Sequence, residues 1–312
     1  MKSTNEIKIV YMGTPYFAQE VLETLIREKY DIIAVVTQPD KPVGRKLIME
    51  KSPVKLIAEK HQIPVIQPIK IRTDYQEILA LKPDIIITCA YGQIIPEILL
   101  NTFLCVNIHA SLLPKLRGGA PMHRAIMNGL DKTGITIQRM AKKMDAGDMI
   151  AQNEVVITAD DTVGTLQAKL IISACNLIKE YLPLILDKKV VYISQDESLV
   201  TFGYNINKEE EFISFKDHYA VVYDHIRSLI PWPVGYGIVD GVKIKLHRVH
   251  ISQETSDLAD GYIIGLIDNA LAVVVENRLL LIDELQLEGR NKITAKDFVN
   301  GNGKKMIDKL FE

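Results

Sequence analysis

Short apolar runs rich in β-branched residues alternate with helical spacing in the first half of the chain. Extended segments are predicted at residues 7–12, 31–36, 84–88, 104–108 and 135–137. A helix is predicted over residues 17–27, where apolar side chains recur three and four positions apart: Phe17, Val21, Leu22, Leu25 and Ile26. Near-continuous apolar strands separated by helices are typical of a parallel sheet covered on both faces. This part of the chain therefore predicts a doubly wound, mostly parallel, Rossmann-like α/β fold.

The pattern changes in the last third of the chain. A long helix is predicted to begin near Thr162 and to stop by Pro183, and after about Tyr204 short alternating segments such as residues 242–247 are separated by glycines. Alternation punctuated by glycine favours a small antiparallel, OB-like β-barrel. The predicted organisation is an N-terminal α/β domain at residues 1–189, a linker at 190–206 and a C-terminal barrel domain at 207–312.

Composition and charge narrow the class of protein. A length of 312 residues favours two domains, and 47% apolar with 24% charged residues is an ordinary globular balance. The 37 basic and 39 acidic side chains nearly cancel, so global charge favours neither nucleic acid nor a membrane as partner. Neither a membrane span nor a signal peptide is recognisable. We expect a cytoplasmic protein without a membrane partner, and nothing in the sequence requires more than a monomer.

Cysteine usage points away from structural cross-links. The cysteines Cys89, Cys105 and Cys175 are odd in number and have no CxxC spacing. This arrangement predicts neither a disulfide framework nor a zinc site. We therefore expect a reduced compartment and no metal.

One strand end carries an unusual set of polar side chains. Asn107 and His109 are two residues apart, so strand alternation places both on one side of the extended segment. An amide donor beside an imidazole suits attack on a carbonyl, because the amide binds a developing oxyanion while the imidazole handles a proton. Asp145 follows a later strand on a glycine-containing loop, from which it would reach His109 if the loop folds back.

The same residues also fit ordinary structural roles. A histidine at a strand end is commonly structural, Asn107 fits a turn cap, and Asp145 before Ala-Gly fits a turn aspartate. Two rival chemistries have weaker support. Ser111 lacks the glycine flanks of a nucleophile elbow, and Cys105 has a histidine nearby only in His109, on the same side of the strand.

The strand-end segment resembles a known enzyme family. The sequence NIHASLLPKLRGGAP at residues 107–121 closely resembles the signature of 10-formyltetrahydrofolate-dependent formyltransferases, and MDAGDM at residues 144–149 resembles that family's folate-binding loop. Further stretches resemble the branch of the family that acts on initiator methionyl-tRNA: residues 12–18, 37–45, 208–210, 285–289 and 295–301. The resemblance extends from about residue 7 to residue 301.

The resemblance implies an activity and a site. It implies transfer of the formyl group of 10-formyltetrahydrofolate, a co-substrate, to the amino group of the methionine on initiator methionyl-tRNA. It carries the catalytic trio onto Asn107, His109 and Asp145. It also implies folate contacts at these positions: Ala90, Tyr91, Gly92, Ser111, Leu112, Leu113, Pro114, Met144, Ala146, Gly147 and Asp148.

Contacts with tRNA are expected in two places. The connection at residues 38–55 contains Lys41, Arg45 and Lys46, and the resemblance implies that it contacts the acceptor arm. In the C-terminal part, Lys243 and Lys245 share one strand face. That part nevertheless has more acidic than basic residues, whereas a general RNA-binding domain would be basic. A solvated charged surface is the alternative explanation for both clusters.

Another acceptor and another class of protein stay open. A formyltransferase acting on an amino-sugar nucleotide would share the catalytic strand and a second domain, although residues 38–45 and 285–301 favour the tRNA branch. An RNA-binding module with an inactive folate pocket is disfavoured, because Asn107, His109 and Asp145 are all present.

Overall fold

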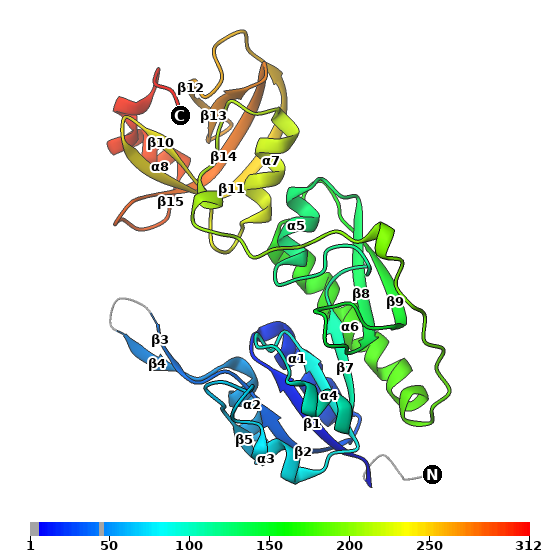
Figure 1. Cartoon of the computed structure of the whole chain (residues 1–312). Coiled ribbons are helices and arrows are strands. Elements are labelled where there is room, and N and C mark those ends of the chain that lie inside the picture. Colours follow the sequence, from blue (N-terminus) through cyan, green and yellow to red (C-terminus); the bar gives the residue numbers. More distant parts are fainter. Residues whose placement is uncertain (1–5, 44–46) are drawn as a thin grey trace. The chain divides into compact units, whose positions relative to one another are not determined.

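All five extended segments predicted in the first half of the chain are strands in the computed structural model, which describes residues 6–43 and 47–312 (Figure 1). The chain divides into two units whose segments interleave in sequence. Unit 1 comprises Met1–Pro121, Thr133–Val156 and Gln167–Tyr204, and unit 2 comprises Met122–Lys132, Ile157–Leu166 and Asn205–Glu312. The domain boundaries at residues 189 and 206 stay a prediction. In the part of the chain described, no helix has the length and apolar character that membrane crossing requires.

Unit 1 is built on a seven-stranded sheet in the order β5-β2-β1-β6-β7-β8-β9. All the neighbouring pairs from β5 to β7 are parallel, and β8 pairs antiparallel with β7. The mostly parallel sheet predicted from the apolar runs is therefore confirmed. The strands are β1 (Lys8–Gly13), β2 (Asp31–Val36), β5 (Val65–Ile66), β6 (Ile85–Cys89), β7 (Leu104–His109), β8 (Lys132–Arg139) and β9 (Met149–Val156).

Helices cover both faces of this sheet. Val10 and Met12 of β1 pack with Ile78 and Leu99, which lie on α3 and α4. Tyr11 alternates to the opposite face, where its hydroxyl donates to the Ala18 carbonyl of α1. Because residues alternate across a strand, these contacts place different helices on the two faces. The helices of unit 1 are α1 (Tyr16–Arg27), α2 (Pro53–Lys60), α3 (Gln76–Leu81), α4 (Glu97–Thr102) and, from Gln167 on, α6 (Val163–Leu186). The helix α5 (Pro121–Met127) belongs to unit 2 except for its first residue.

The long helix α6 continues past the residue at which it was predicted to stop. Pro183 lies inside α6, which ends at Leu186. Proline removes its own N–H donor, but its carbonyl still accepts, and here it receives the amide of Asp187 at 3.0 Å. The predicted stop at Pro183 is therefore wrong. This proline lies in the final turn of α6, where the helix has only three residues left.

The connection at residues 38–55 contains an antiparallel hairpin, β3 (Lys41–Val43) and β4 (Ile48–Glu50), whose strands pair with each other (Figure 1). Exposed apolar side chains lie on its second arm, with Leu47, Ile48 and Met49 each at least 60% exposed. The connection ends at α2, where the Ser52 hydroxyl accepts the Lys55 amide (3.1 Å) and Pro53 occupies the first turn. A serine cap followed by proline is a strong helix start.

Unit 2 contains an antiparallel sheet in the order β10-β11-β14-β13-β12, with β15 on β14, which confirms the predicted antiparallel C-terminal fold. Its strand β13 is buried on both faces: Leu271 and Val273 join one core cluster, and Ala272 and Val274 join another. The elements are α7 (Tyr219–Ser228), β10 (Tyr236–Val239), β11 (Val242–Thr255), β12 (Ile263–Ile267), β13 (Ala270–Val275), β14 (Arg278–Leu287), β15 (Ile293–Thr294) and α8 (Ala295–Asn300).

A buried arginine joins separate chain segments within unit 2. Arg227 on α7 is 6% exposed, and its Nη1 donates to the carbonyls of Thr158 (3.1 Å) and Asp161 (2.7 Å). Its Nε donates to Asp224 at 2.7 Å. Because a buried charge is stable only when it is paired and hydrogen-bonded, these contacts tie residues 157–166 to the C-terminal part of the chain.

Candidate active site

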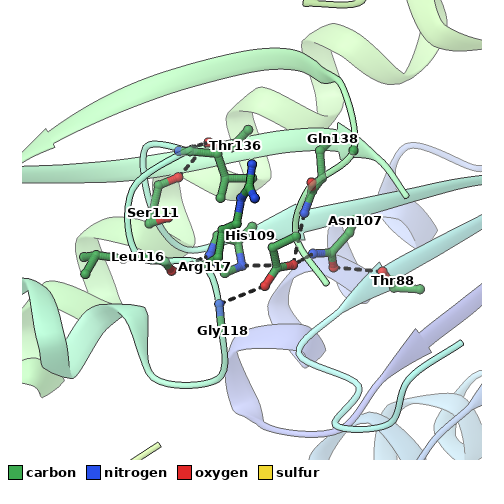
Figure 2. Close-up of polar contacts among 12 residues, drawn as sticks. Thr88, Asn107, His109, Ser111, Leu116, Arg117, Gly118, Thr136 and Gln138 are labelled. Carbon is green, nitrogen blue, oxygen red and sulfur yellow. Dashed lines mark hydrogen bonds and ion pairs between the residues drawn. The ribbon is translucent and has the colours of Figure 1, made fainter. Parts of the chain in front are cut away.

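A row of polar side chains crosses three neighbouring strands of the unit 1 sheet. Thr88 of β6 is the register partner of Asn107 on β7, and Asn107 is the partner of Gln138 on β8. Figure 2 shows these three side chains gathered with His109 and Gly118. The row lies toward the carboxyl ends of β6 and β7, where ligands bind in open α/β sheets.

The neighbours of Asn107 determine how its amide points. The Thr88 hydroxyl donates to Asn107 Oδ1 at 2.8 Å, so the oxygen side of the amide is occupied. Asn107 Nδ2 then faces Asp145 Oδ1 at 3.4 Å. An ionised carboxylate only accepts, so the side of the amide that faces Asp145 must be its nitrogen, and the Thr88 hydroxyl is then free to donate to the oxygen. The N–H donors of Asn107 are therefore held toward the centre of the site.

Asp145 receives several donors at once. Its Oδ2 accepts the Gly118 amide at 2.9 Å, and its Oδ1 accepts Gln138 Nε2 at 3.1 Å. The backbone of Asp145 is left-handed, with a φ of 51°, a conformation that aspartate tolerates better than most residues. A Cβ atom at Gly147 would lie 1.7 Å from the Arg139 carbonyl, so only glycine fits there. The loop is thus closely packed against the end of β8.

His109 is 6% exposed and lies between two acceptors. Its Nε2 is 3.0 Å from the Leu116 carbonyl, and its Nδ1 is 3.6 Å from Asp145 Oδ1. A carbonyl only accepts, so Nε2 carries a proton. Nδ1 faces the Asp145 carboxylate on the other side of the ring. The geometry brings the predicted trio of Asn107, His109 and Asp145 together.

The segment at residues 111–114 is held by structural hydrogen bonds. Ser111 Oγ donates to the Lys115 carbonyl at 2.6 Å, and Thr136 Oγ1 both donates to the Ser111 carbonyl and accepts the Leu113 amide. Ser111 and Leu113 are buried, whereas Leu112 and Pro114 are half-buried. The predicted folate contacts in this segment therefore lie in a hydrogen-bonded turn directly after β7.

The other predicted folate positions lie on two loops of unit 1. Ala90 and Gly92, directly after β6, are exposed and have positive φ angles of 46° and 88°. Between them, the Tyr91 side chain is buried, and burial raises the pKa of its phenol. On the second loop, Met144 is 56% exposed and Gly147 is buried. The residues on either side of Gly147, Ala146 and Asp148, are half-buried.

The predicted tRNA-contacting residues lie in different settings. Lys41 is exposed on the β3–β4 hairpin, whereas Arg45 and Lys46 lie outside the described residues. Lys243 Nζ lies 4.3 Å from the centre of the Tyr236 ring, and Lys245 Nζ donates to the Pro233 carbonyl at 3.3 Å. Both lysines alternate with buried residues of β11, so they share its outer face.

Sequence reasoning missed Thr88 and Gln138, which orient Asn107 and Asp145. Each is a polar residue near the end of an apolar strand, as Asn107 is. That feature is the only signal in the sequence, and it became informative once strand register was known.

The rival nucleophile Cys105 is buried away from this chemistry. It is 3% exposed, its thiol donates to the Leu99 carbonyl, and burial raises its pKa to about 12. A thiol that remains protonated is a poor nucleophile. Separately, among residues 6–43 and 47–312, no group of three or more His, Cys, Asp or Glu side chains could hold a metal ion.

Solved structures share this fold at low sequence identity. HypX from Aquifex aeolicus, in complex with tetrahydrofolic acid, aligns with a TM-score of 0.70 and 15% identity over 97% of this chain and 48% of HypX. An N-formyltransferase from Helicobacter canadensis, in complex with folinic acid and dTDP-3-aminofucose, aligns with a TM-score of 0.69 and 19% identity. The alignment covers 92% of this chain and 100% of that chain. These similarities establish the fold alone.

Sequence comparisons give closer relatives. The chain is 46% identical to the methionyl-tRNA formyltransferase of Bacillus cytotoxicus over 95% of this chain and 96% of that protein. It is 45% identical to the methionyl-tRNA formyltransferase of Bacillus mycoides over 98% and 99% of the two chains. The formyl transferase family model matches residues 7–181, and the model of the formyl transferase C-terminal domain matches residues 205–303. The chain therefore belongs to the formyl transferase family.

Proposed function

We propose that this protein transfers the formyl group of 10-formyltetrahydrofolate to the amino group of the methionine on initiator methionyl-tRNA. The observation that carries the proposal is the 46% identity to a methionyl-tRNA formyltransferase over nearly the full length of both chains. The cluster of Asn107, His109 and Asp145 supports the chemistry, because its groups suit attack on a carbonyl.

In this reaction one bond to the formyl carbon replaces another. The methionine nitrogen bonds to the formyl carbon and loses a proton, while the bond to the folate nitrogen breaks and that nitrogen gains a proton. As the amine attacks, negative charge develops on the formyl oxygen. The Nδ2 donor of Asn107, held by Thr88, stabilises this charge, and the imidazole of His109, held by the Leu116 carbonyl, lies beside it to handle a proton.

Asp145 acts mainly through His109 in this proposal. Its carboxylate lies 3.6 Å from His109 Nδ1 and 3.4 Å from Asn107 Nδ2, so it orients both side chains. Gln138 and Gly118 donate to the same carboxylate and hold it in place. Proton transfer between the amine and the folate nitrogen then takes place beside an imidazole and a carboxylate of fixed geometry.

We place the folate co-substrate against two loops of unit 1, residues 90–92 and residues 144–148. Exposed backbone at Ala90 and Gly92 leaves main-chain groups accessible to a flat heterocycle. Tyr91 supports this turn from within, because its carbonyl accepts Thr14 Oγ1 and Gln38 Nε2. We assign pteridine binding to this turn and to residues 144–148, and we assign the wall beside the formyl group to residues 111–114.

We assign tRNA contacts to the hairpin and to the outer face of β11. The hairpin offers Lys41 together with exposed apolar side chains, and Arg45 and Lys46 belong to the same connection. Lys243 and Lys245 offer two charges on β11 for phosphate contacts. The protein would act in the cytoplasm, since its acceptor serves translation. We propose that it acts as a monomer.

Acceptor competition tests the proposal directly. Purified protein is incubated with radiolabelled 10-formyltetrahydrofolate and either methionyl initiator tRNA or an amino-sugar nucleotide, with His109→Ala as the matched inactive control. Product on the tRNA with the wild-type protein alone supports the proposal. Product on the sugar alone would keep the formyl transfer and overturn the acceptor, and product on neither would overturn the reaction.

A further inference from the structure

The segment at residues 193–203, which lies within the predicted linker, belongs to unit 1 and pairs with it on both sides of the loop that carries Asp145 (residues 143–149). Ile193 and Met149 exchange backbone hydrogen bonds of 2.8 and 2.9 Å. Farther along, the Arg117 amide donates to the Thr201 carbonyl (2.9 Å) and the Gly203 amide donates to the Arg117 carbonyl (2.8 Å). The segment is therefore held at both ends, with residues 194–200 crossing between the two attachments.

The side chain of Gln195 joins this segment to the loop that carries Asp145. Its Nε2 donates to the carbonyls of Asp145 at 2.8 Å and Gly147 at 2.7 Å. Its Oε1 accepts Nε and Nη2 of Arg117 at 3.0 and 2.8 Å. Carbonyls only accept and a guanidinium only donates, so this amide has a single satisfactory orientation.

Arg117 completes the connection from below the surface. It is 1% exposed, and its Nη2 also donates to Glu197 at 2.8 Å. Glu197 in turn accepts a hydrogen bond from Lys143 Nζ at 2.7 Å, and Lys143 begins the loop that carries Asp145. Burial of a guanidinium is costly unless it is paired and hydrogen-bonded. Here Nε and Nη2 are bonded to Gln195 and Glu197, whereas Nη1 is buried without a hydrogen-bond partner in the described part of the chain.

These contacts act on the backbone of the loop, whereas Gly118 and Gln138 hold the Asp145 side chain. Lys143 and Met144 are exposed, and Asp145 has a left-handed backbone that an unsupported aspartate adopts only part of the time. The two N–H donors of Gln195 bind the carbonyl of Asp145 itself and the carbonyl of Gly147, two residues later. They therefore restrict the backbone from which the carboxylate extends toward His109.

We propose that Gln195, held by Arg117, is a positioning residue for formyl transfer: it fixes the loop so that the Asp145 carboxylate faces His109 and Asn107. This inference rests on the proposed function. Gln195 acts through Asp145, so its loss should lower the rate of the chemical step more than it weakens substrate binding.

The variant Gln195→Glu tests this role with little change of shape. A carboxylate still accepts from Arg117 but has no N–H for the two loop carbonyls. We expect kcat to fall about 10- to 100-fold, the range that a small misplacement of a catalytic group produces. The KM values for both substrates should stay within about twofold. The control Ser198→Ala lies on the same segment, where its exposed hydroxyl donates to Asp196 Oδ1 at 2.7 Å, and it should leave kcat within about twofold.

A double-mutant cycle separates positioning from a general structural role. In an Asp145→Asn background, Gln195→Glu should cost less than about threefold in kcat, since the group that it positions is already impaired. Fully multiplicative losses in the two variants would overturn the inference. So would a wild-type kcat in the Gln195→Glu variant.

Hydrogen exchange of the loop gives a readout that does not depend on turnover. Amides of residues 143–149 should exchange at least about tenfold faster in Gln195→Glu than in the wild-type protein, with Ser198→Ala unchanged. Unchanged exchange would contradict the inference even if activity fell. If the wild-type protein transfers no formyl group, the proposed function fails while this measurement still decides the role of Gln195. If Gln195→Glu does not fold, Gln195→Met supplies the same comparison without a new charge.

Discussion

Replacing Thr88 by valine should disturb Asn107 while leaving the sheet intact. Thr88 is 3% exposed, and valine has nearly the same shape, so β6 keeps its packing. The change removes the hydroxyl that donates to Asn107 Oδ1 at 2.8 Å. Asp145 still holds the Nδ2 end of the amide, but the oxygen end has lost its donor, so the N–H groups are less firmly directed toward the oxyanion.

The expected size follows from this single contact. A neutral hydrogen bond contributes about 0.5–1.5 kcal/mol, and if the whole of it is lost from the transition state the rate falls about 2- to 13-fold. The same loss should lower the free energy of unfolding by up to about 1.5 kcal/mol. The rate effect should fall on kcat, because Thr88 interacts with Asn107 and is buried from substrate.

Steady-state formylation at saturating folate and tRNA measures this effect. Thr88→Ser is the matched control, since it keeps the hydroxyl and loses only a methyl group, and it should retain most of the wild-type kcat. If Thr88→Val is as fast as the wild-type protein, the orientation argument for Asn107 is refuted. If Thr88→Ser is as slow as Thr88→Val, packing rather than the hydroxyl accounts for the loss.

Three further outcomes are expected. His109→Ala should slow single-turnover formyl transfer about 10²- to 10⁴-fold while filter binding shows tRNA affinity within about threefold, and survival of activity would contradict its assignment. Gly147→Ala should lower kcat about 100-fold, because a Cβ would lie 1.7 Å from the Arg139 carbonyl and displace the loop; a near-normal rate would show that the loop can move freely. Hydrogen bonds from Arg117 and Lys143 lower the pKa of Glu197 from 4.5 to about 2, so its contribution to stability should be present above pH 4.5 and disappear as the pH falls toward 2. Urea unfolding of wild type and Glu197→Gln across this range checks the sign, which is wrong if the difference grows in acid.

Local patterns were enough to predict the strands and part of the site. Asn107 and His109 are two residues apart on one strand, so alternation alone placed them on the same side. Asp145 required the family resemblance, because nothing in its spacing shows that its loop folds back to β7. The structure supplies that fold through Gly118 and Gln138.

Residues that depend on long-range contacts could not be predicted from the sequence. Thr88 and Gln138 support the site only because strand register places them beside Asn107, and register between distant strands leaves no periodic signal. Gln195 was assigned to a linker because its segment has neither helical nor strand periodicity. The strands β3 and β4 were likewise not predicted, since three residues each are too few for a pattern.

The interleaving of the two units affects the order in which the chain can fold on the ribosome. Synthesis delivers residues 157–166 well before α7, yet these residues belong to unit 2 and accept both Nη1 hydrogen bonds of Arg227. The emerging chain can assemble β1, β2, β6 and β7 early, but residues 122–132 and 157–166 must wait for partners made later. A nascent chain stopped after residue 204 would therefore expose two segments that belong to a unit not yet synthesised.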